Sequence, residues 1–105
     1  MNSADRVLEE NELLASWSVE QVLVNAYTDR RAMGVAAASM IARQILHVLE
    51  TKPDVRMVFA AAPSQSEMIS SLLAIRDIPW ERVTAFHMDD YLDLPADAPQ
   101  RFANW

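Results

Sequence analysis

Residues 55–61 form the segment VRMVFAA, which is apolar apart from one arginine. A near-continuous apolar run of this length is typical of a strand buried in a parallel sheet. Pro63 ends the run, and residues 64–77 carry apolar side chains at helical spacing. Residues 83–88 (VTAFHM) are again typical of a strand. The sequence therefore predicts two parallel strands joined by a helical crossover, which nearly always has a right-handed sense.

A further strand and helix are predicted before this unit. Residues 19–27 contain a β-branched cluster typical of a first strand, and residues 30–50 are rich in Ala, Met, Leu and Ile, which favour a helix. Thr28 and Asp29 are candidates for its N-cap. The resulting order β-α-β-α-β predicts an α/β fold, a three-layer Rossmann-like unit with a parallel sheet.

The N-terminal residues are expected to form a separate element. Residues 4–16 have helical character, and we predict an N-terminal helical arm over residues 1–18 and an α/β unit over residues 19–105. In open α/β sheets, ligands bind beyond the carboxyl ends of the strands. The segments 62–67 and 87–94 follow two predicted strands, so they are the candidate site segments.

Composition excludes several classes of function. The chain has 105 residues, 51% of them hydrophobic, and a formal net charge of −6 without a basic stripe, which argues against nucleic-acid binding. Without cysteine, disulfides and thiolate chemistry are excluded, and two histidines distant in sequence are a poor metal signature. The N-terminus has no apolar signal core, and no run of about 18 apolar residues predicts a membrane span. We expect a cytoplasmic protein that uses no metal or cofactor.

The segment APSQSE, residues 62–67, links a predicted strand to a predicted helix. A helix N-terminus attracts phosphate through free backbone N–H groups, and Ser64, Gln65 and Ser66 could add side-chain donors. Ser64 and Glu67 also have the spacing of a capping box, which explains both residues without any ligand. The two interpretations are compatible, because a capped helix keeps other free N–H groups.

The segment FHMDDYLDLP, residues 86–95, leads from an apolar strand directly into two acids. Neighbouring residues at a strand end point to opposite faces, so Asp89 and Asp90 should lie in different environments. A carboxylate in a partly apolar crevice can serve in proton transfer. The alternative is that these acids only form a turn. His87 is expected to pack within the strand rather than face the site.

The run AFHMDDYLDLP, followed by APQRF at residues 98–102, resembles the glucosamine-6-phosphate deaminase/isomerase family. The segment FAAAPSQSE at residues 59–67 lies where that family has its first phosphate loop, one helix before the acidic motif. The resemblance covers residues 20–105 and implies conversion of an amino-sugar 6-phosphate to a ketose 6-phosphate with release of ammonia. It implies that Asp89 is the general base, and that Ser64, Gln65, Ser66 and Asp90 contact the substrate.

Two departures from the family pattern shape the expectation. The phosphate loop of the family is usually Gly-rich, whereas residues 62–67 contain no glycine. Family members are over twice as long, and their ring-opening Asp-His-Glu group and phosphate-binding Lys have no counterpart here. We therefore expect the N-terminal part of a sugar-phosphate isomerase/deaminase domain, weakly active or inactive alone. An incomplete sheet also predicts a homo-oligomer.

Three alternatives remain. The same scaffold could serve as a sugar-phosphate sensor, which would need the phosphate loop but not Asp89. It could hydrolyse a sugar-phosphate lactone, although the intact MDDY motif argues against this. The last alternative is a folding unit without a ligand whose exposed strand edge drives self-association.

Overall fold

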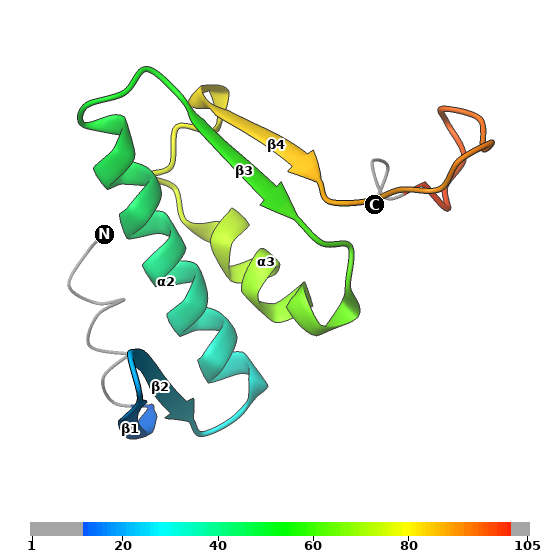
Figure 1. Cartoon of the computed structure of the whole chain (residues 1–105). Helices are drawn as coiled ribbons and strands as arrows, with labels where there is room; N and C mark the ends of the chain where they lie inside the picture. The colour runs from blue at the N-terminus through cyan, green and yellow to red at the C-terminus, as the bar shows by residue number, and fades with distance from the viewer. Residues whose placement is uncertain (1–11, 102–105) are drawn as a thin grey trace.

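The computed structural model describes residues 12–101 and shows a mixed α/β structure (Figure 1). Its regular elements are β1 (Leu13–Val19), β2 (Val22–Tyr27), α2 (Arg30–Leu49), β3 (Val55–Phe59), α3 (Ser66–Ala74) and β4 (Val83–His87). Two 3-10 turns, Pro63–Gln65 and Trp80–Arg82, precede α3 and β4. The predicted β-α-β-α-β order is therefore found from β2 to β4.

The first two strands form an antiparallel hairpin. Val19 pairs with Val22 across a two-residue turn, in which Glu20 has a left-handed backbone (φ 54°). Ser16 Oγ donates a hydrogen bond to Asn25 Oδ1 across the strands at 2.7 Å. This pairing corrects two predictions. The helical character expected up to residue 16 is wrong for residues 13–16, which lie in β1, and β2 pairs with β1 rather than joining a parallel sheet. Residues 4–11 of the predicted arm lie outside the described residues.

The second sheet is the parallel pair predicted from residues 55–61 and 83–88. Val55 pairs with Val83, and Phe59 at the end of β3 pairs with His87 at the end of β4. Figure 1 shows α2 and α3 side by side next to this pair. The buried core consists of Ala38, Ala42, Ile45 and Leu49 of α2, Val55 of β3, Leu72 of α3, and Ile78, and Val83 of β4 packs against it partly buried. Both helices therefore cover the same face of the sheet.

The other face of the β3–β4 pair is exposed. It carries Arg56, Val58, Thr84 and Phe86, and the two apolar side chains are 66% (Val58) and 51% (Phe86) exposed. Within residues 12–101, one helical layer thus packs on one sheet face, and the three-layer Rossmann-like arrangement is not seen. The described structure consists of two helices and two separate two-stranded sheets, one antiparallel and one parallel.

The first turn of α2 is fixed by polar contacts. Ala32 N donates to Asp29 Oδ1 at 2.7 Å, which confirms Asp29 as the N-cap. Arg31 Nη2 donates to Glu12 Oε1 at 2.6 Å, and Thr28 N donates to Glu12 O at 3.2 Å. The start of α2 is therefore tied to the residue that precedes the hairpin.

By length and composition, α2 meets the criterion for a membrane-spanning helix, although the sequence was expected to contain no such segment. Core helices of soluble proteins meet the same criterion. In this structure α2 contributes Ala38, Ala42 and Ile45 to the core, each no more than 2% exposed. Packing against α3 and β3 involves part of this apolar surface, and 44% of the segment that meets the criterion is buried.

The packing of α2 on α3 depends on Gly34, the single glycine of the chain. A Cβ at this position would lie 2.9 Å from Glu67 Cβ and 2.9 Å from the backbone nitrogen of Met68. Real Cβ atoms essentially never approach other atoms so closely. The absence of a side chain at Gly34 therefore lets the N-terminal turn of α3 rest directly on α2.

We predict that Gly34→Ala destabilises the protein by about 1 kcal/mol. Alanine favours a helix over glycine by about 1 kcal/mol, but overpacking against backbone atoms costs roughly 1–3 kcal/mol. Urea unfolding monitored by circular dichroism measures the difference. Met40→Ala, at a half-exposed position of the same helix, is the control and should change stability by less than about 0.5 kcal/mol. A Gly34→Ala protein more stable than wild type would contradict the close contact.

Candidate functional site

The loop after β3 does not form the predicted capping box. Pro63–Gln65 form a 3-10 turn, so α3 begins only at Ser66. Its N-cap is Gln65, which makes no side-chain capping hydrogen bond. Ser64 is exposed. The capping interpretation of Ser64 and Glu67 is therefore wrong, because the N-cap of α3 is one residue later than that motif requires.

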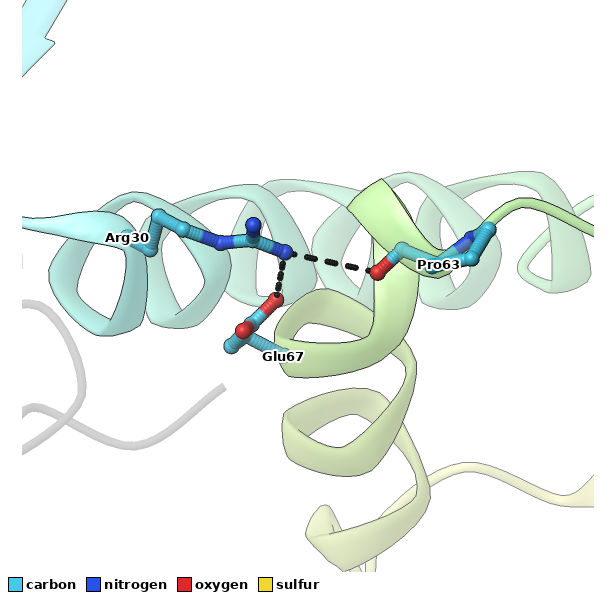
Figure 2. Close-up of polar contacts among 3 residues, drawn as sticks. All are labelled: Arg30, Pro63 and Glu67. Carbon is cyan, nitrogen blue, oxygen red and sulfur yellow. Dashed lines mark hydrogen bonds and ion pairs between the residues drawn. The ribbon is translucent and has the colours of Figure 1, made fainter.

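Glu67 pairs instead with Arg30, from the first turn of α2. Arg30 Nη2 donates to Glu67 Oε2 at 2.8 Å and to the carbonyl oxygen of Pro63 at 3.3 Å (Figure 2). The hydrogen bond from Arg30 holds the pKa of Glu67 below its usual range, with a smaller contribution from a backbone N–H. One guanidinium group thus fixes both the 3-10 turn and the start of α3.

The segment after β4 leaves the sheet at the same edge. Met88 N donates to Phe59 O at 2.9 Å, which extends the parallel ladder one step past His87. Asp89 follows directly and is exposed. Asp90 Oδ1 accepts a hydrogen bond from Tyr91 N at 2.8 Å. The two neighbouring acids therefore have different environments, as predicted, but no apolar crevice encloses Asp89.

Asp90 contributes to the internal structure of the C-terminal loop. Its Oδ2 lies 3.6 Å from Nε of Arg101, and Nη1 of Arg101 donates to the carbonyl oxygen of Leu94 at 3.0 Å. These contacts span residues 90–101 and fold the loop back on itself. They give Asp90 a structural role, while its predicted contact with substrate stays a prediction.

An open hollow of about 320 Å³ lies at the carboxyl ends of β3 and β4. Its lining comes from three elements: Phe59 of β3, Ser66, Ile69 and Ser70 of α3, and His87 of β4. Two hydroxyl groups and one imidazole thus surround a space with an apolar wall. This composition fits a small ligand with hydroxyl groups, and the volume lies at the lower end of the range for small-molecule sites.

The structure brings some of the predicted site residues together at this edge and separates others. Ser66 lines the hollow, whereas Ser64, Gln65, Asp89 and Asp90 do not belong to its lining. Gln65 Oε1 is buried and accepts no hydrogen bond from the described part of the chain. A buried amide oxygen without a donor is costly, but its burial keeps Gln65 Oε1 out of reach of a ligand in the hollow unless the side chain turns.

Three residues of this region were missed or misjudged from the sequence. His87 was expected to pack within the strand, but it is exposed and lines the hollow. Ser70 lies one helical turn after Ser66, and this i, i+4 spacing was the available signal. Arg30 is 33 residues from Pro63 and 37 from Glu67, so no local pattern could have linked them.

Residues 12–101 contain no cluster of three or more His, Cys, Asp or Glu side chains that could hold a metal ion. Comparison of the chain with protein-family models, curated proteins and solved structures finds no match.

We predict that Arg30→Gln raises the pKa of Glu67 toward its ordinary value. Wild-type Glu67 has a lowered pKa in the folded state, so its stabilising contribution is present above the unfolded pKa and is lost as pH falls through the folded pKa. That contribution should be small, because both side chains are substantially exposed to solvent. Titration of the Glu67 carboxyl carbon by NMR measures the shift in wild type and variant.

The matched control is Arg76→Gln, at an exposed position outside this contact. In that variant the Glu67 pKa should stay as low as in wild type. An unchanged Glu67 pKa in Arg30→Gln would show that Arg30 is not its partner in solution.

Proposed function

We propose that the chain acts on sugar phosphates as a member of the glucosamine-6-phosphate deaminase/isomerase family. The observation that carries the proposal is the parallel β3–α3–β4 unit, which brings two sequence segments to one edge. The loop with Ser64, Gln65 and Ser66 follows β3, and the MDDY segment follows β4. Ligand sites of open α/β sheets lie at this edge.

The chemistry proposed for Asp89 is proton transfer between neighbouring carbons of the opened sugar. The carboxylate takes the proton from C2 and returns it to C1, while a proton from the amino nitrogen passes to O1, so the C1 aldehyde becomes an alcohol and C2 becomes an imine. Water then hydrolyses the imine to the ketone and releases ammonia. The position of Asp89 supports this role, because it follows β4 two residues after His87, which lines the hollow.

The loop supplies uncharged hydrogen-bonding groups for the substrate. Ser64 and Ser66 offer exposed hydroxyls, and the Gln65 side chain would have to turn toward the substrate, because its Oε1 is buried. Arg30 donates a hydrogen bond to Pro63 O, which would restrain the conformation of the loop before a ligand binds. Groups that are ordered before binding lose less entropy on binding.

The proposal includes a three-layer Rossmann-like unit. Parallel sheets are normally covered on both faces. Val58 and Phe86 provide an apolar surface on the exposed face of the β3–β4 pair, which a further layer would cover.

A second candidate is a sensor that binds a sugar phosphate without converting it. The specific observation in its favour is that Asp89 is exposed and does not line the hollow. A sensor would use the same loop and hollow, and the two candidates differ only in the role of Asp89.

We predict that glucosamine 6-phosphate raises the melting temperature of the whole chain in a concentration-dependent manner. A ligand that binds only the native state stabilises it by mass action, by about 2.7 kcal/mol at one hundred times Kd. Differential scanning fluorimetry measures the rise, with mannitol as the uncharged control. A cooperatively folded sample whose melting temperature does not respond to glucosamine 6-phosphate would refute the proposed function.

Asp89→Asn separates the enzyme from the sensor. Loss of a general base lowers a rate by about 10²–10⁴-fold, so ammonia release should fall by that factor while the ligand-induced rise in melting temperature persists. Asp97→Asn, an exposed acid in the same loop region, is the matched control and should keep the wild-type rate. Binding without ammonia release from either wild type or variant is expected of a sensor, and equally of an isomerase part that lacks the ring-opening group of the family.

A further inference from the structure

The hollow at the carboxyl ends of β3 and β4 is lined by hydroxyl, imidazole and apolar side chains. Among the described residues, no Asp, Glu, Lys or Arg belongs to its lining. Its polar groups are the hydroxyls of Ser66 and Ser70 and the imidazole of His87, and Phe59 and Ile69 form its apolar part. With no carboxylate, ammonium or guanidinium group among these lining residues, the lining matches a hydroxylated part of a ligand.

The polar groups of the hollow are held on rigid elements. His87 ends β4 and pairs with Phe59, and the hydrogen bond from Met88 N to Phe59 O (2.9 Å) continues the ladder beyond it. Ser66 and Ser70 are four residues apart on α3, so both lie on the same side of that helix. The hollow therefore presents two hydroxyls from one helix and an imidazole from a strand end, which favours recognition of a fixed pattern of ligand hydroxyls.

We propose that His87 and Ser70 form a subsite for the hydroxyl groups of the sugar chain, and that this subsite selects a polyhydroxylated phosphate ester over phosphate itself. The inference rests on the proposed function and adds two residues that the family motifs do not identify. Hydroxyl and imidazole groups can each donate and accept hydrogen bonds, as can the sugar hydroxyls that they would meet. The C–H faces of the sugar carbons would lie against Phe59 and Ile69.

The test compares the affinities of single variants for two probes, glucosamine 6-phosphate and inorganic phosphate. His87→Phe keeps an aromatic ring but removes the hydrogen bonds, and Ser70→Ala removes one hydroxyl. Both positions are exposed, so both variants should fold as wild type does. Each variant should bind glucosamine 6-phosphate roughly 3- to 10-fold more weakly than wild type, with inorganic phosphate affinity unchanged.

Matched controls are His47→Phe, on the exposed part of α2, and Ser71→Ala, beside Ser70 but outside the lining of the hollow. Both should bind the two probes as wild type does. Wild-type binding with unchanged affinity in His87→Phe and Ser70→Ala would overturn the subsite and leave the proposed function standing. An equal loss of affinity for both probes would also overturn it, because the subsite would then not distinguish the sugar phosphate from phosphate alone. A wild-type chain that binds neither probe would overturn the proposed function and the subsite together.

Discussion

The close contact of α2 with α3 brings both helices onto one face of the β3–β4 pair. Gly34 leaves no side chain between the helices, and the backbone of α3 at residues 67–68 comes within 3 Å of the position that a Cβ would occupy. Ala38 and Ala42 continue the same buried surface of α2 with small side chains. With the two helices this close, β3 and β4 can share one apolar face with both of them. The edge that carries the hollow is thus positioned by a contact remote from any ligand.

The parallel unit could be predicted because its signals are local. The apolar run that forms β3 and the Ala-rich segment that forms α2 each indicate a buried element by their own composition. The hairpin could not be predicted in the same way. Its turn uses Glu20 at a positive φ, where Asn or Gly is usual, and this residue gives no turn signal. The start of α3 was misplaced because Ser64 and Glu67 matched a capping pattern, whereas the chain forms a 3-10 turn first.

In the candidate site, too, some residues could be predicted from the sequence and others could not. The two segments at the strand ends could be found from the strand–helix order, and Ser66 was among the residues chosen. The role of His87 depends on its pairing with Phe59, which lies 28 residues away and is set by the register of the sheet. Arg30 acts on the loop from another helix. Contacts between residues so far apart in the chain depend on tertiary packing, and the pattern of a single sequence does not predict them.

Arg30 and Arg31 are neighbours, yet they hold two different parts of the molecule. Arg30 binds Glu67 in α3, and Arg31 binds Glu12 ahead of the hairpin. Both arginine side chains are more than half exposed, so mobile ions in solution can reach them. Screening of exposed charges increases with ionic strength, and the screening length falls to about 8 Å under physiological conditions. Salt should therefore weaken the contact of Arg31 ahead of the hairpin and the contacts of Arg30 with residues 63–67 together, since both arginines belong to the same helical turn.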